Sequence, residues 1–186
     1  MPSRKKPSPR TRVLVGGAAL AVVGAGVVGT VAASAAGSTD ATPAAVAARD
    51  GELTQSTHLT LDAATKAARA AVEAAEKDGR HVSVAVVDRT GNTLVTLRGD
   101  GAGPQSYASA ERKAFTAVSW NAPTSELAGR LAQAPTLKDI PGTLFLAGGT
   151  PVTAKGAPVA GIGVAGAPSG DLDERYARAG AAVLGR

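Results

Sequence analysis

The chain has 186 residues, enough for about one domain, and 44% of them are hydrophobic, which suits a compact core. Its 20 lysines and arginines exceed its 15 acidic residues, but all five excess cations lie within the first twelve positions. The remainder is balanced, so the basic overall charge does not predict a nucleic-acid partner. No cysteine is present, which excludes disulfides and thiolate metal ligands.

The N-terminal residues have the three parts of a secretory signal peptide. A basic segment precedes an uncharged apolar run over residues 13–33, and Ala33-Ser34-Ala35 provides an A-x-A cleavage site. We therefore expect a signal peptide over residues 1–35 and a secreted or extracytoplasmic mature protein. The alternative is an uncleaved membrane anchor, because the apolar run approaches the roughly 20 residues that a bilayer needs. Residues 36–57 predict a flexible leader, and residues 58–186 the folded domain.

The first predicted elements are a helix and a hairpin. Apolar residues at helical spacing predict a helix over residues 61–78, with Thr60 as its N-cap. Two β-branched, alternating runs then predict strands over residues 82–87 and 93–98, joined by a turn rich in Asp, Thr, Gly and Asn. Both faces of the first strand are mostly apolar, so we expect it inside a sheet.

Two further helices are expected in the middle of the chain. One begins near Ser106 and is interrupted at Asn121-Ala122-Pro123. A short helix over residues 125–133 follows, with Thr124 as a candidate cap.

The C-terminal third predicts three short strands and a last helix. The strands are expected over residues 143–147, after the turn at residues 148–152, and over residues 158–166. Glycine alternates with Val, Ala and Ile in the last of them, so another element should pack directly against its backbone. Asp171 provides a capping-box-like start for a helix that ends near Leu184.

This order of elements indicates an α+β domain. It consists of a helix, two strands, two helices, three strands and a helix, joined by short connections. The pattern predicts a largely antiparallel sheet of about five strands with helices packed on it.

Four segments in this order resemble the GlcG and HbpS-type haem-binding family. They are VSVAVVDRTGNTL, SAERKAFTA, PGTLFLAGGTPV and VAGIGVAGAPSGDLDERYARAG, and the resemblance spans residues 59–184. It implies a profilin-like α+β fold. With the export signal, it is closest to the secreted branch, which implies haem binding, haem degradation, redox sensing, assembly into octamers and communication with a membrane sensor histidine kinase.

The chain offers few side chains that could hold haem iron. Its one methionine is the initiator, so axial candidates reduce to two histidines and two tyrosines. His81 stands before the hairpin and His58 at the start of the domain, and either could instead be an exposed residue without a ligand. The resemblance assigns haem binding to Thr116 and the neighbouring basic residues Arg112 and Lys113. We expect Thr116 to line or orient the site and a cation to bind the propionates.

Glu73 and Glu76 form an ExxE pair on one face of the first helix. Two carboxylates at this spacing can share a hard cation, and the resemblance implies ferric iron there. The competing interpretation is a solvated helix face, because Arg69 and Lys77 lie four residues from Glu73, at ion-pair spacing.

Other enzyme classes find little support in the sequence. No G-x-S-x-G nucleophile elbow occurs, and two histidines do not make an H-x-x-x-H metal pair. The sequence therefore leaves three functions open: an exported protein that binds and senses haem and iron, a haem-degrading enzyme, and an oligomeric interaction module without small-molecule chemistry.

Overall fold

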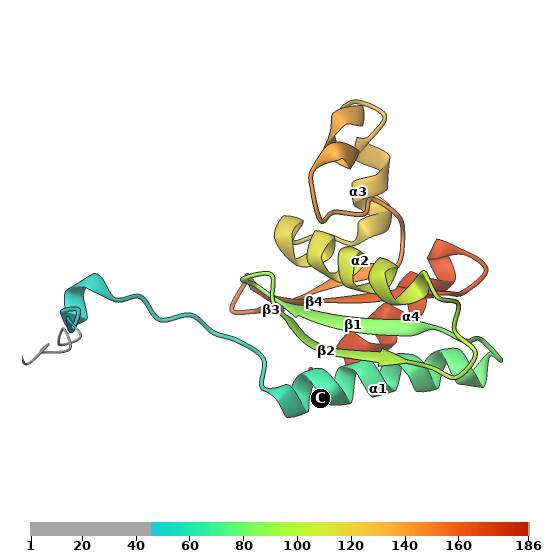
Figure 1. Cartoon of the computed structure of the whole chain (residues 1–186), viewed down its shortest axis with the longest axis horizontal. Helices are drawn as coiled ribbons and strands as arrows, with labels where there is room; N and C mark the ends of the chain where they lie inside the picture. Colours follow the sequence, from blue (N-terminus) through green and yellow to red (C-terminus); the bar gives the residue numbers. More distant parts are fainter. Residues whose placement is uncertain (1–45, 186) are drawn as a thin grey trace, which may run out of the picture. The chain divides into compact units, whose positions relative to one another are not determined.

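A four-stranded antiparallel sheet in the order β2-β1-β4-β3 forms the middle layer of the fold (Figure 1). The computed structural model describes residues 46–185. Its strands are β1 (Ser83–Asp88), β2 (Thr93–Arg98), β3 (Gly149–Ala154) and β4 (Ala157–Ala165). The predicted α+β class is confirmed, with four strands in place of about five.

Helices cover both faces of this sheet (Figure 1). The long helices are α1 (Leu61–Lys77), α2 (Ser106–Trp120) and α4 (Gly170–Ala182). α1 and α4 pack together on one face, and α2 lies across β4 and β1 on the other. The short helices α3 (Thr124–Arg130) and η2 (Pro135–Asp139) form a lobe that projects beyond α2, and a single 3₁₀ turn, η1 (Asp50–Glu52), precedes the domain.

The predicted hairpin is present and occupies the position expected of it. β1 is buried along its whole length and pairs with β2 on one side and β4 on the other. Its alternation sorts the side chains onto two faces. Val84 and Val86 join the core under α1 and α4, whereas Ala85 and Val87 join the core under α2. β2 is an edge strand, which explains its more polar pattern.

Two glycines of β4 allow α2 to approach the sheet backbone. A Cβ atom at Gly163 would lie 2.0 Å from the carbonyl oxygen of Ala110, and one at Gly161 would lie 2.1 Å from that of Ala114. These positions have no space for any side chain. The prediction that an element packs directly against the glycine-bearing strand is therefore confirmed, and the element is α2.

The predicted strand over residues 143–147 does not form. α2 side chains bind the backbone here: Thr116 Oγ1 accepts from Leu144 N–H at 2.8 Å, and Arg112 donates to the Thr143 carbonyl at 2.6 Å. Phe145 is buried and packs edge-on against Trp120, with ring centroids 5.8 Å apart. The Thr143 carbonyl and the Leu144 N–H therefore have partners on α2 in place of a neighbouring strand.

The N-cap of α1 is the predicted residue, whereas the N-cap of α4 is a different one. Thr60 caps α1 as predicted, and its hydroxyl accepts from Ala63 N–H at 3.2 Å. α4 is capped by Ser169, whose side chain accepts from Leu172 N–H, and Asp171 lies in the first turn.

The expected cap of the third helix also has another role. Pro123 occupies the N-cap position of α3, and Thr124 lies inside the helix. The Thr124 hydroxyl accepts from Gly149 N–H at 2.7 Å, so it joins α3 to the start of β3. α3 ends at Arg130, three residues before the predicted end.

The predicted signal peptide, residues 1–35, lies outside the described residues, as does the first part of the predicted leader. Residues 46–57 are exposed and contain no regular structure beyond the η1 turn. Within residues 46–185, no helix is long and apolar enough to cross a bilayer.

Candidate functional site

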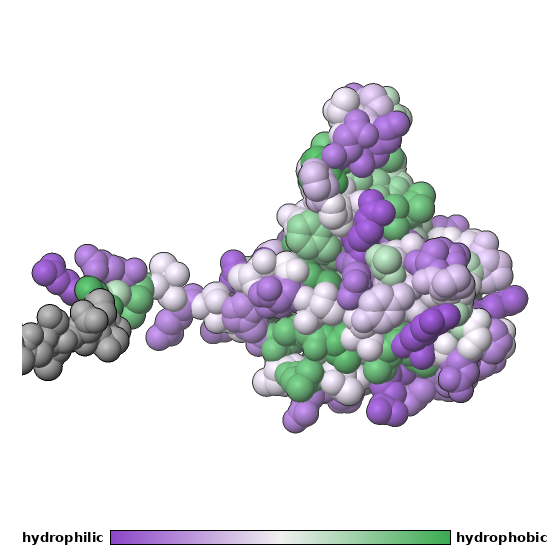
Figure 2. Space-filling view, in the orientation of Figure 1, coloured by the Kyte–Doolittle hydropathy of each residue, from purple (hydrophilic) through white to green (hydrophobic). Residues whose placement is uncertain are grey.

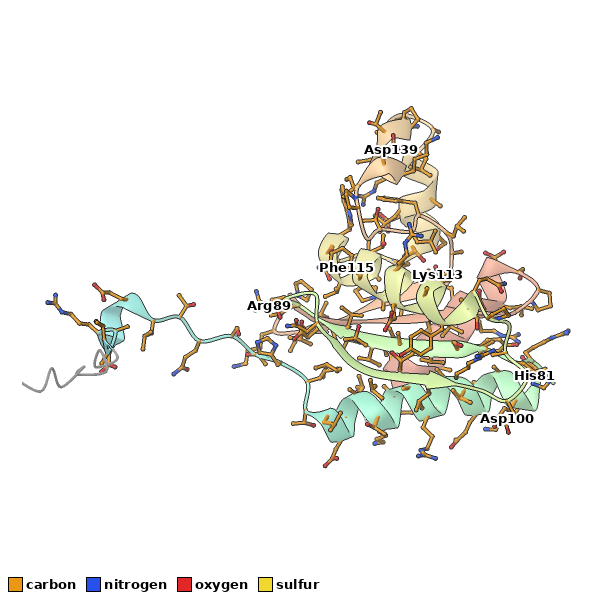
Figure 3. All side chains as sticks on the ribbon, viewed as in Figure 1. His81, Arg89, Asp100, Lys113, Phe115 and Asp139 are labelled. Carbon is orange, nitrogen blue, oxygen red and sulfur yellow. The ribbon has the colours of Figure 1, made fainter. Side chains whose placement is uncertain are left out.

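The five predicted haem-binding residues do not converge on one pocket. Thr116 and Lys113 are buried, whereas Arg112, His58 and His81 are exposed. The exposed three lie in two separate regions. Arg112 lines a hollow with Gly91 of the β1–β2 turn, and His58 lies against Asp88 at the start of that turn. His81 lies at the other end of the sheet (Figure 3).

Lys113 is held inside the protein. Its ammonium group lies 2.8 Å from Asp173 Oδ2 and donates to the Val164 carbonyl at 3.1 Å. Burial raises the pKa of Asp173, although the Lys113 charge and hydrogen bond act in the opposite direction. The pair joins α2 to α4 past the end of the sheet, so the Lys113 side chain points away from any external ligand.

Thr116 is a positioning residue in this structure. Its side chain is fully buried, donates to the Arg112 carbonyl at 2.7 Å and accepts from Leu144 N–H. Both hydrogen-bonding functions of the hydroxyl are therefore used within the protein. Thr116 fixes the segment after η2 against α2, and its hydroxyl has no contact left for a ligand.

A shallow hollow opens between α2 and the β1–β2 turn. It has a volume of about 170 Å³ and is lined by Val87, Gly91, Thr93, Glu111, Arg112, Phe115 and Gly142. Phe115 is half-buried, and its ring fits between two glycines: a Cβ atom would meet it at 3.0 Å from Gly91 and at 3.5 Å from Gly142. We call this region the α2 hollow. It combines an aromatic wall with the guanidinium of Arg112.

His58 lies against the same β1–β2 turn. Its Nδ1 atom is 3.7 Å from Asp88 Oδ2, and its Nε2 atom is 2.5 Å from Ser56 Oγ. Asp88 is held in place by Thr90 and Asn92, whose side chains and backbone N–H groups donate to its carboxylate. Sequence reasoning missed the contact between His58 and Asp88, because nothing local shows that these two residues, thirty positions apart, come close.

The Asp88 carboxylate should stabilise the folded state only at pH values where it is ionised. Burial raises its pKa, but the hydrogen bonds from Thr90 and Asn92 outweigh this and hold the pKa at about 2, against an ordinary value of 3.8. A lowered pKa in the folded state contributes stability that is complete above about pH 4 and lost as the pH falls towards 2. The shift corresponds to about 2 kcal/mol.

Urea titrations at pH 6 and in steps from pH 4 to 2 check this expectation. Between pH 6 and pH 2, the free energy of unfolding of the native chain should fall by about 2 kcal/mol more than that of Asp88→Asn. The variant has no carboxylate to protonate at this position. Equal losses in the two proteins would contradict the assignment.

His81 stands at the opposite end of the sheet from the β1–β2 turn, as its separation from Arg89 shows (Figure 3). The imidazole ring packs against the loop after β2, where a Cβ atom at Gly101 would meet it at 3.4 Å. Gly101 has a φ of 77°, so glycine is favoured there for its conformation as well. His81 and the α2 hollow are therefore different regions of the surface.

Glu73 and Glu76 line a second hollow, of about 300 Å³, between α1 and the end of β2. Its other lining residues are Arg69, Val72, Leu97, Arg98, Gly99 and Asp100. Both glutamates are exposed, and the ion pairs present in residues 46–185 do not include one from Glu73 to Arg69 or to Lys77. No cluster of three or more His, Asp or Glu ligands occurs within the described part of the chain.

Comparison with known proteins identifies the family. The sequence model described as "Haem degrading protein HbpS-like" matches residues 59–182. The chain belongs to the HbpS-like family. The resemblance noted from the four sequence segments is thereby confirmed, and the protein is a member of a haem-related family.

Solved structures of HbpS-like proteins extend this result. A double variant of Streptomyces reticuli HbpS is 92% identical, with 78% of this chain and 99% of that chain covered and a TM-score of 0.77. A structure described as HbpS is 95% identical, with coverage of 76% and 100% and a TM-score of 0.75. A PduOC–haem complex is 27% identical, with coverage of 68% and 94% and a TM-score of 0.62. Among curated proteins, the sequence comparison found no match.

A whole haem does not fit inside the α2 hollow or inside the hollow between α1 and β2. These measure about 170 and 300 Å³, at or below the lower limit of roughly 300–1,000 Å³ for ligand pockets. Apolar and polar surface alternate over the face seen in Figure 2. The residues present can supply a propionate partner, an aromatic surface and a histidine, but a bound porphyrin ring would remain partly outside one copy of the chain.

Proposed function

We propose that this HbpS-like protein binds haem at the α2 hollow. The observation that carries the proposal is that Phe115 and Arg112 line one hollow in a member of this family. The ring and the glycine backbone around it provide an apolar surface for the porphyrin. Arg112 binds a propionate, because a guanidinium presents paired donors to a carboxylate.

We take His58 as the axial candidate, because the β1–β2 turn links it to the α2 hollow. It touches Asp88 at one end of the β1–β2 turn, while Gly91 of the same turn touches Phe115. His81 remains the alternative axial ligand, in a binding mode that does not use the α2 hollow. The two histidines can be separated experimentally because they lie at opposite ends of the sheet.

Hemin titration of the purified chain tests the proposal. Binding at the α2 hollow should give a shifted Soret band with a defined stoichiometry, and absence of a shift at micromolar hemin would rule the function out. His58→Ala should alter the position of the band and His81→Ala should not. The reverse result would assign the haem site to the end of the sheet where His81 lies.

Arg112→Ala should weaken hemin binding about tenfold, which corresponds to the loss of one partly exposed charge-assisted contact of about 1.4 kcal/mol. The matched control is Arg130→Ala, which removes an exposed arginine from the neighbouring helix α3. Equal affinities of the two variants would contradict the assignment of Arg112. Circular dichroism should accompany the titration, because Arg112 also donates to the Thr143 carbonyl.

Ferric iron binding by Glu73 and Glu76 is part of the proposal. The support is a coincidence of spacing: the Streptomyces reticuli variant changes two glutamates three positions apart to aspartate, and Glu73 and Glu76 are the only glutamates so spaced in this chain. Two exposed carboxylates make a weak site on their own, so a second copy of the chain completes the ligand set. Loss of ferric iron binding, measured by calorimetric titration, in Glu73→Gln/Glu76→Gln would support this role.

Haem degradation is the second candidate function, favoured by the description of the matched family. With peroxide or a reductant supplied, degradation would appear as time-dependent loss of the Soret band and release of iron above a protein-free control. A stable spectrum under these conditions would leave binding as the function.

The cellular role that we propose follows the family and the N-terminal sequence. The protein is exported after cleavage near Ala35, assembles into a homo-oligomer such as an octamer, and reports haem or iron to a membrane sensor histidine kinase. Haem left partly outside one copy supports assembly, since a second copy can cover the exposed ring face. A monomer by light scattering, with and without hemin, would contradict this part of the proposal.

A further inference from the structure

A mainly apolar groove opens along the edge strand β3, and we call it the β3 groove. It has a volume of about 350 Å³, and residues 151–154 of β3 form one wall. Within residues 46–185, β3 pairs only with β4, so the other side of its backbone has no neighbouring strand. An extended segment can pair with such an edge while its side chains enter the groove. The remaining lining residues are Leu59, Val159, Ala181, Leu184 and Gly185.

The leader that ends at this groove exposes an apolar side chain of its own. Leu53 is 60% exposed, and its backbone is extended, with φ of −104° and ψ of 145°. Residues 53–60 belong to no helix or strand, and Leu59 lies in the groove itself. The leader therefore has the conformation and the apolar residue that binding along an edge strand requires.

The match to the Streptomyces reticuli HbpS variant extends into the leader. It covers 78% of this chain, which is about 145 of 186 residues. Residues 58–186 number 129, so about fifteen leader positions have counterparts with coordinates in that structure. Residues at the start of a domain are poorly ordered unless another element holds them. We therefore expect a surface that binds the leader.

The path of the chain directs the leader away from its own β3 groove. Leu59 lines the groove, but the preceding residue, His58, lies against Asp88 of β1, with Nδ1 3.7 Å from Oδ2. Because β4 lies between β1 and β3, the chain leaves the groove towards the opposite edge of the sheet. Leu53 could return only if residues 54–57 reversed this direction. Binding in the groove of a second copy requires no reversal.

We propose that the leader of one copy binds in the β3 groove of a second copy, with Leu53 as its apolar anchor. The leader backbone pairs with the free edge of β3, and the Leu53 side chain is buried against the end of α4. This inference rests on the homo-oligomer of the proposed function and assigns one of its contacts to named residues.

Disulfide trapping tests this contact, because the native chain contains no cysteine. Chains with Thr54→Cys are mixed with chains with Thr153→Cys, since both positions are exposed and Thr153 lines the groove. Oxidation should join positions 54 and 153 of different chains, as shown by peptide mapping. The control pair, Thr54→Cys with Ile140→Cys, uses another exposed position and should give less than about a tenth of that yield. Equal yields from the two pairs, or no disulfide in either, would overturn the inference.

The role of Leu53 is tested in the same assay. Leu53→Asp in the Thr54→Cys chain should lower the yield of the 54–153 disulfide about tenfold, because a charge replaces a buried apolar side chain. Gln55→Asp adds the same charge to the leader and keeps Leu53, so its yield should stay within about twofold. Equal decreases in the two variants would overturn the assignment of Leu53.

Two further measurements separate this inference from the proposed assembly. An oligomer by light scattering that forms no 54–153 disulfide would overturn the inference and leave the assembly intact, whereas a monomer would contradict both. In the double variant Thr54→Cys/Thr153→Cys, the disulfide should join two chains. A disulfide that forms only within one chain would overturn the choice of a second copy.

Discussion

Replacing Gly163 with alanine should destabilise the domain by about 3 kcal/mol or more, the upper range of overpacking effects. The new Cβ atom would lie 2.0 Å from the Ala110 carbonyl oxygen and 2.5 Å from the Ala114 nitrogen, so α2 must move off the sheet. Gly163 does not have a positive φ, and the cost is therefore steric rather than conformational. Urea denaturation followed by circular dichroism measures the change.

Gly129→Ala is the matched control for this substitution. Gly129 lies in α3, and a Cβ atom there would meet nothing within 4 Å. The same change of one hydrogen to a methyl group should be neutral or stabilising by roughly 0.5–1 kcal/mol in a helix. Similar destabilisation by both variants would contradict the close contact between α2 and β4.

Asp173→Ala should cost roughly 3–5 kcal/mol, because it leaves the Lys113 ammonium buried without its anion. Lys113→Met should be similarly harmful at neutral pH. The double variant Lys113→Met/Asp173→Leu should recover most of the loss, since it removes both buried charges together. Urea denaturation of the single and double variants measures the coupling between the two residues.

The pH dependence of Lys113→Met separates a buried charge from a simple packing defect. Burial raises the pKa of Asp173, and the substitution removes the charge and hydrogen bond that oppose this rise. A group with a raised pKa binds its proton more tightly in the folded state, so the variant loses stability as the pH rises from about 4. The difference between variant and native chain should narrow on acidification, and a constant difference would contradict the assignment.

Local patterns in the sequence predicted most of the fold. The helix of residues 61–77, the hairpin and the packing against β4 glycines follow from periodicity, turn residues and the absence of side chains. The absence of a strand over residues 143–147 could not be predicted in the same way. Thr143 and Leu144 look extended, but the groups that satisfy their backbone are Arg112 and Thr116, about thirty residues earlier on another helix.

The candidate site was less predictable than the fold, because its geometry depends on contacts between distant residues. The SAERKAFTA segment does not show that Lys113 turns inward to Asp173 while Arg112 remains outside. Arg112 and Lys113 are adjacent basic residues, and the sequence alone does not distinguish their roles. The alternating exposure along α2, with its inner face against β4, decides which of them can meet a ligand.

The bare backbone of β4 also bears on the shape of the α2 hollow. α2 sits at a distance from the sheet that Gly161 and Gly163 determine, so its inner face consists of small residues whose identity is tightly constrained. Arg112 and Phe115 are tied to the fold from the other side of α2, since Phe115 packs against the same core and Arg112 holds the Thr143 carbonyl. A shift of α2 away from the sheet would therefore also move the wall of the α2 hollow, so the two glycines of β4 determine the shape of that hollow without touching it.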